Sequence, residues 1–90
     1  MIGEKVQELR EANNVLLRQL AAQLDMDTAL LSKMERGDRA FRKEDLVKIA
    51  SIFKVSEREL LIVWLADKVL KVVDNESYKK ESLKLVMKII

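Results

Sequence analysis

The stretch "RQLAAQLDMDTALLSKMERG", residues 18–37, contains two short segments with helical periodicity on either side of the polar sequence "DMD". Asp25 lies where the first helix must end, because aspartate tolerates the left-handed conformation better than most residues. Asp27 can cap a second helix, of about residues 28–36, by accepting backbone N–H bonds, and Gly37 is the expected stop of that helix. Two helices joined by such a short turn form the helix-turn-helix pattern.

The rest of the chain predicts further helices around this pair. Apolar residues of the first segment recur at i, i+3, i+4 and i+7: Leu17, Leu20, Ala21 and Leu24. Other helical patterns cover about residues 2–13, 43–53, 57–73 and 77–89, and Ser56 and Glu59 have the spacing of a capping box. The chain has no proline and only two glycines, which favours helix throughout. The sequence therefore predicts an all-α fold of five to six helices.

Several positions in the stretch 18–37 also match the sequence pattern of a known family. The stretch resembles the phage-repressor type of helix-turn-helix, the Xre/Cro family. That family has Leu-Ala in its second helix, a small hydrophobic residue in the turn, and Ser-x-x-Glu-x-Gly at the end of its third helix. The matching residues are Leu20–Ala21, Met26, Ser32, Glu35 and Gly37. Residues 44–61 resemble the family's fourth helix and the step after it, so the resemblance covers residues 2–61 and implies a lambda-repressor-like DNA-binding domain.

The resemblance also implies a structural ion pair and exposes two departures. Arg10 stands where family members carry an arginine that pairs with Glu35, and we expect this bridge to tie the first helix to the third. Leu17 replaces a glutamine that often touches a phosphate, which removes one contact. Asp25 replaces the customary glycine, which adds some backbone strain and a negative charge near the DNA side.

The helix of residues 28–36 is the expected reader of DNA, since the major groove is wide enough for one helix. Periodicity gives it an outward face of Thr28, Ala29, Ser32, Lys33 and Arg36. By resemblance, Thr28, Ala29 and Lys33 fall where family members touch bases. Asp27 and Ser32 fall where contacts to base or backbone occur. Lys33 is the strongest candidate because lysine can donate to guanine O6 or N7, whereas the methyl groups of Thr28 and Ala29 can pack on thymine.

Residues 36–43 hold the densest basic cluster in a chain whose formal net charge is only +2. Its cations, opposed by Asp38 alone, are Arg36, Arg39, Arg42 and Lys43. We expect them to bind DNA phosphates. Such contacts supply affinity and fix the position of the protein on the duplex, but they do not recognise the base sequence. Arg18 is expected to join them from the preceding helix. The alternative interpretation is an ordinary solvated loop.

The C-terminal third of the chain carries the expected dimer surface. A second copy on a two-fold axis is needed to read two half-sites about one helical turn apart. The helix of residues 57–73 is apolar nearly all round and must be covered on more than one side. Leu60, Leu61 and Trp64 can complete the core, which leaves for dimerisation Ile62, Val63, Ala66, Val69, Leu70 and Val73. The last helix of the same chain is the alternative cover.

These assignments give a domain organisation. We expect residues 1–56 to form the helix-turn-helix DNA-binding core. Residues 57–90 are expected to form C-terminal helices that complete this core and dimerise, the whole being a single compact domain.

The composition argues against several other classes of protein. There is no cysteine and no histidine, no Gly-rich phosphate loop and no metal-ligand set, so we expect no enzyme activity, no catalytic residue, no cofactor and no metal. The N-terminus has no apolar region typical of a signal peptide. The longest apolar run, "LLIVWLA", is far short of the roughly 20 residues needed to span a bilayer. We expect a cytoplasmic protein with no membrane partner.

The sequence thus favours a sequence-specific transcriptional regulator, a repressor or autoregulator. It is expected to bind double-stranded DNA through the major groove as a homodimer on a palindromic operator. The alternative is a protein-interaction module, such as an antitoxin, that holds a second protein through its apolar C-terminal helices. The basic residues 36–43 and Lys33 favour DNA. The long apolar tail indicates that some partner exists, whether a second copy or another protein.

Overall fold

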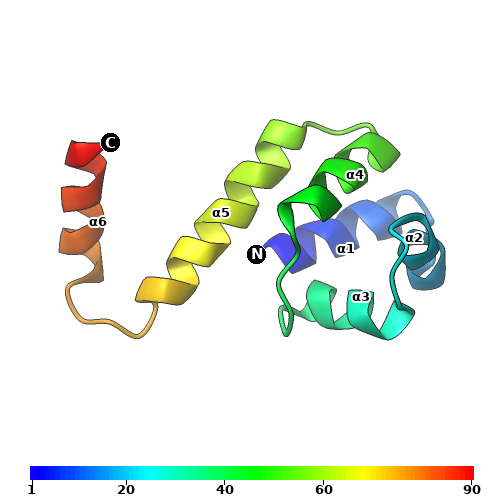
Figure 1. Ribbon diagram of the computed structural model, residues 1–90, viewed down its shortest axis with the longest axis horizontal. Coiled ribbons are helices and arrows are strands. Elements are labelled where there is room, and N and C mark those ends of the chain that lie inside the picture. The colour runs from blue at the N-terminus through cyan, green and yellow to red at the C-terminus, as the bar shows by residue number, and fades with distance from the viewer.

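Six helices and no strands make up the computed structural model, which describes all 90 residues (Figure 1). The helices are α1 (Ile2–Ala12), α2 (Leu17–Gln23), α3 (Thr28–Arg36), α4 (Lys43–Phe53), α5 (Glu57–Val73) and α6 (Lys79–Ile89). The all-helical expectation is confirmed, with six helices rather than five. Helices α1 to α4 and the first half of α5 pack together, whereas α6 stands beyond the far end of α5.

The turn between α2 and α3 has the backbone that the sequence predicts. Asp25 has a φ of 54°, so it occupies the left-handed region that suits glycine best. Gly37 ends α3 with a φ of 86°, and its N–H and that of Asp38 return to carbonyls of the last turn. Asn14, before α2, also has a positive φ of 56°. The start of α2 and both ends of α3 are therefore determined by the residues in the turns next to them.

The core is built from all five packed helices and the loop before α4. The apolar residues with almost no exposure include Val6, Leu20, Leu31, Leu46, Ile49 and Leu60. Leu61 and Trp64 pack half-buried against this cluster. The first part of α5 therefore completes the core, as the sequence predicts.

Gly3 allows α1 and α3 to lie unusually close. A Cβ atom at this position would collide with the backbone carbonyl groups of Met34 and Glu35. These carbonyl groups belong to the backbone of α3 and cannot rotate away as a flexible side chain could. Only glycine therefore fits at position 3 unless one of the two helices moves. This close approach brings α1 against the inner side of α3.

The ion pair between Arg10 and Glu35 is confirmed and is bidentate. Arg10 Nε lies 2.9 Å from Glu35 Oε2, and Arg10 Nη2 lies 3.0 Å from Oε1. Arg10 Nη1 also donates to the carbonyl of Val15 at 3.1 Å. The hydrogen bond to Glu35 raises the pKa of Arg10 above its ordinary value. Glu35 is only 6% exposed, so the pair joins α1, α3 and the chain before α2 from inside.

The C-terminal half of the molecule leaves much apolar surface in solvent. Ser56 Oγ caps α5 by accepting from the N–H of Glu59 at 3.2 Å, which supplies one of the two bonds of the expected capping box. Beyond Leu60 no residue of α5 is buried, and every residue of α6 except Lys79 is exposed. No helix combines the length and apolar character that crossing a bilayer requires.

Candidate nucleic-acid interface

Helix α3 has one buried face and one face open to solvent. Leu31, Met34 and Glu35 are buried against the rest of the molecule. Thr28, Ala29, Lys33 and Arg36 are exposed, and Ser32 is half-buried. The structure therefore brings together on one surface the outward residues that the periodicity predicts, with α2 packed behind them.

Asp27 uses its carboxylate to hold the start of α3. Its Oδ1 accepts from the backbone N–H of Ala29 at 2.8 Å, and its own backbone is extended. This is the predicted N-cap. Because its carboxylate is negatively charged and already accepts a bond from the protein, Asp27 is suited to positioning Thr28 and Ala29 and would not contact a phosphate.

Arg36 is engaged with its neighbours at the end of α3. Its Nη1 donates to Ser32 Oγ at 3.3 Å, and its Nε lies 3.3 Å from Asp38 Oδ2. Arg36 and Asp38 are both largely exposed. Such a surface ion pair contributes little stability, so the guanidinium can exchange Asp38 for another anion.

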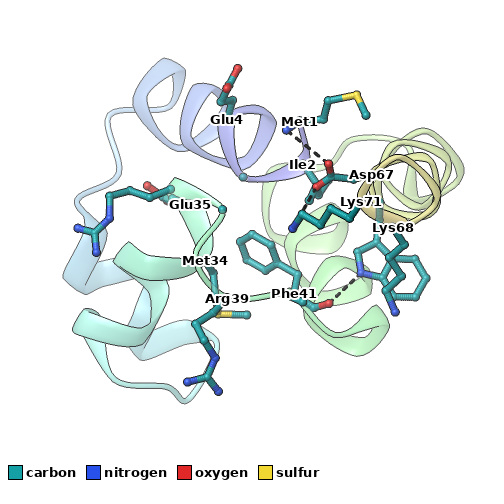
Figure 2. Close-up of a pocket in the computed structure, with 15 residues that line it drawn as sticks. Met1, Ile2, Glu4, Met34, Glu35, Arg39, Phe41, Asp67, Lys68 and Lys71 are labelled. Carbon is teal, nitrogen blue, oxygen red and sulfur yellow. Dashed lines mark hydrogen bonds and ion pairs between the residues drawn. The ribbon is translucent and has the colours of Figure 1, made fainter. Parts of the chain in front are cut away.

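The loop of residues 37–42 is anchored by an aromatic residue that the sequence analysis did not single out. Phe41 is buried in the core although it lies among charged residues. Figure 2 shows its ring pointing inward and its carbonyl group accepting a hydrogen bond from the indole Nε1 of Trp64, at 2.8 Å. Lys68 Nζ lies 4.0 Å from the centre of the Trp64 ring, a cation–π contact. A single phenylalanine in a basic segment was the only available signal.

The remaining basic side chains of the interface differ in whether they form ion pairs or hydrogen bonds within the protein. Arg39 is exposed, points away from the molecule in Figure 2, and makes no hydrogen bond or ion pair. Lys43 and Arg18 are likewise exposed and unpaired. Arg42, in contrast, bonds to Asp45.

The pair of Arg42 and Asp45 forms the start of α4. Arg42 Nη2 lies 3.1 Å from Asp45 Oδ1, and the backbone N–H of Arg42 donates to Asp45 Oδ2 at 3.0 Å. Asp45 is buried, whereas the Arg42 side chain is mostly exposed. The hydrogen bond to Asp45 raises the pKa of Arg42 above its ordinary value. The charge of Arg42 is therefore largely balanced by a neighbouring residue.

A small pocket lies behind this loop, between the start of α1 and α5 (Figure 2). Asp67 lies in it between the N-terminal amine, at 3.8 Å, and Lys71 Nζ, at 3.9 Å. The pocket encloses about 120 Å³, well below the roughly 300–1,000 Å³ of small-molecule sites. No group of three or more acidic side chains is placed to hold a metal ion.

Comparisons with known proteins agree with this geometry. Residues 6–60 match the protein-family model described as Helix-turn-helix. Among solved structures, a chain of a SinR protein/SinI protein complex is similar, with a TM-score of 0.61 and 22% sequence identity over 98% of this chain and 94% of that chain. That likeness reflects the fold. No curated protein matches the sequence.

Proposed function

This chain belongs to the helix-turn-helix family of the Xre and lambda-repressor type and is a DNA-binding transcriptional regulator, and we propose that it binds a palindromic operator as a homodimer. The observation that carries the proposal is the open face of α3, with Thr28, Ala29 and Lys33 exposed above a buried inner face. Proteins of this family are typically not enzymes, and we propose no catalytic role. The protein would act in the cytoplasm, where its DNA lies.

The proposed base contacts come from the N-terminal half of α3. In helix-turn-helix proteins these residues face base edges in the major groove. Lys33 is free of internal partners and can donate to guanine. Thr28 and Ala29 present methyl groups that fit the thymine methyl. Asp27 fixes their position through its cap on Ala29, and Ser32 lies between them and Arg36.

Substitution of Lys33 tests this assignment. Lys33→Ala is expected to cost about 1–3 kcal/mol of discrimination at one base pair, because a good side-chain contact to a base edge contributes that much. Lys5→Ala is the matched control, since it removes the same charge from an exposed position on α1. Binding to a set of operators with single base-pair changes measures both. A Lys33→Ala protein with an unchanged base preference would refute the contact.

We rank the proposed phosphate contacts by whether each basic side chain already has an ionic partner within the protein. Arg18, Arg39 and Lys43 have no internal partner. Arg36 can exchange its exposed partner Asp38 for a phosphate. Arg42 is held by the buried Asp45, so it contributes least to counterion release.

This grading gives a prediction about salt dependence. Arg39→Ala and Lys43→Ala are each expected to reduce the slope of log affinity against log salt concentration by about 1. Arg42→Ala is expected to change that slope much less, because Asp45 already balances its charge. Fluorescence anisotropy with one labelled duplex over a range of salt concentrations gives all the slopes. Equal changes for the three variants would show that the ion pair does not restrain Arg42.

The proposed dimer surface lies on the outward side of α5. Ile62, Val69 and Leu70 are 52%, 39% and 44% exposed, and Ala66 and Val73 lie beside them in the same groove. Val63, which the sequence assigned to this surface, instead packs half-buried against the core. Exposed apolar area of this extent on a small protein marks an interaction surface. A two-fold pair of chains would bury it and present two α3 helices to successive half-sites.

A second candidate function rests on the same apolar surface. The solved structure that this chain resembles is a complex of two different proteins, SinR and SinI. We therefore keep the alternative of an interaction module, such as an antitoxin, that holds a partner protein. A gel shift with the DNA upstream of the gene, at low and raised salt, separates the two. Salt-sensitive, sequence-specific retention favours the regulator, and its absence favours the interaction module.

A further inference from the structure

Helices α5 and α6 form an open V (Figure 1). The side chains that line its inner surface are apolar. The groove between them has a volume of about 500 Å³ and is lined only by apolar residues. Six come from α5: Ile62, Leu65, Ala66, Val69, Leu70 and Val73. Leu83 is the residue that α6 contributes, and Met1 at the N-terminus also lines the groove. Much of the proposed dimer surface is thus one wall of a groove that α6 borders through Leu83 and leaves open.

Helix α6 has the amphipathic pattern of a helix that packs against another. Leu83, Val86, Met87 and Ile90 recur at i, i+3, i+4 and i+7, which places them on one face. Lys84 and Lys88 lie four residues apart on a neighbouring side of the helix. Met87 and Ile90 are 70% and 90% exposed, so most of this apolar face has no cover within the chain.

The connection between the helices holds them apart. Lys79 Nζ donates to the carbonyl of Asp74 at 3.0 Å, and the N–H of Glu76 donates to the carbonyl of Val73 at 2.9 Å. Tyr78 turns the chain with a φ of 52°. These contacts direct α6 away from its own α5 and leave a space that another helix can enter.

The area available favours an occupant that contacts both helices. Burial of one large aliphatic side chain removes roughly 100 Å² from water, so five half-exposed ones on α5 offer roughly 250 Å². A stable interface buries roughly 800 Å² on each partner, somewhat more than half of it apolar. The apolar face of α6 and the residue after it add four exposed large apolar side chains, Leu83, Val86, Met87 and Ile90, which roughly doubles the apolar area available. An interface of α5 alone would therefore be small.

We infer that the occupant is α5 of a second copy, so that two V-shaped hairpins interlock and each α6 packs on the partner's α5. This rests on the proposed homodimer. The outward face of α5 beyond Leu60 carries no charged residue, and neither does the apolar face of α6 from Leu83 onward. Lys79 precedes Leu83 on that side of α6, but its Nζ is bound to the carbonyl of Asp74, so two identical copies can bury both faces without burying an unpaired charge. The lysines of α6 stay in solvent. The same exchange occurs twice across the two-fold axis.

The absence of cysteine makes a clean cross-linking test possible. Leu65→Cys places a thiol on α5 and Met87→Cys places one on α6, both at exposed positions. The two purified single variants are mixed, allowed to exchange and mildly oxidised, and intact mass identifies each disulfide. Mixed disulfides between positions 65 and 87 should exceed those of the control pair, Leu65→Cys with Lys84→Cys, by roughly tenfold, because a disulfide needs Cα atoms within roughly 7 Å.

Each other outcome has a defined meaning. If the double variant Leu65→Cys/Met87→Cys closes a disulfide within one chain and the mixture gives none, α6 covers its own α5 and the interlock is wrong. A protein that sediments as a dimer but forms no 65–87 disulfide also overturns the interlock, while the proposed homodimer survives. A wild-type monomer at tens of micromolar overturns both.

A second measurement does not depend on cysteine. Met87→Asp should raise the dimer dissociation constant roughly tenfold or more, because a charge would be buried against apolar side chains. Lys84→Asp, outside the apolar face of α6, should change it far less. Circular dichroism checks that both variants fold. Equal dissociation constants for the two variants would remove α6 from the interface.

Discussion

Replacement of Glu35 with alanine is expected to lower the free energy of unfolding by about 3–5 kcal/mol, because loss of one member of a buried ion pair leaves the other charge unpaired. Glu35 is 6% exposed and holds two bonds from Arg10. The pair joins α1 to α3, so its loss also loosens the helix proposed to read DNA. Urea unfolding followed by circular dichroism gives the free energy.

Two further variants make this prediction specific. Glu8→Ala removes an exposed, unpaired carboxylate from α1 and is expected to change stability by no more than about 0.5 kcal/mol. Arg10→Met combined with Glu35→Met removes both charges and should recover a large part of the loss. If Glu35→Ala is as stable as Glu8→Ala, the pair does not hold the fold together.

Aspartate at Val69 is expected to yield monomers and to weaken operator binding by roughly 10²- to 10⁴-fold, the advantage that two linked binding sites have over one. Val69 is 39% exposed and lines the groove between α5 and α6. In a single chain the new carboxylate can stay in water, so the fold survives. In a dimer it would be buried among apolar side chains, which is costly. Sedimentation and binding to duplexes with one or two half-sites measure the two effects.

Asn75→Asp is the matched control because it adds the same charge in the exposed connection between α5 and α6. It should remain dimeric and bind the full operator like the wild type. Binding to a single half-site should be similar for all three proteins. An aspartate at Val69 that leaves the protein dimeric would exclude this face of α5 from the interface.

Local patterns were sufficient to predict much of the fold. The positive φ of Asp25, the cap by Asp27 and the stop at Gly37 each depend on the residue itself and its immediate neighbours. Family resemblance added the bond between Arg10 and Glu35, which no periodicity predicts. The outward face of α3 followed from spacing alone, since one face of that helix had to be buried.

Features that depend on distant parts of the chain could not be predicted. Phe41 is buried because Trp64 and the core receive it, and its charged neighbours gave no hint of that. Gly3 matters only because α3 happens to cross it closely. The splay of α6 depends on Tyr78 and the bonds around it. Arg39 and Arg42 look equivalent in the sequence. The structure shows that Arg42 is paired with Asp45 whereas Arg39 has no ionic partner.

Selection of bound duplexes from a random DNA pool tests most directly whether the open face of α3 reads DNA. We predict an enriched palindrome whose half-sites are centred roughly 10 base pairs, one helical turn, apart. The same selection with Lys33→Ala should lose the preference at one symmetric pair of positions. Recovery of no common sequence, or of the same palindrome by a protein altered at both Thr28 and Lys33, would contradict the account.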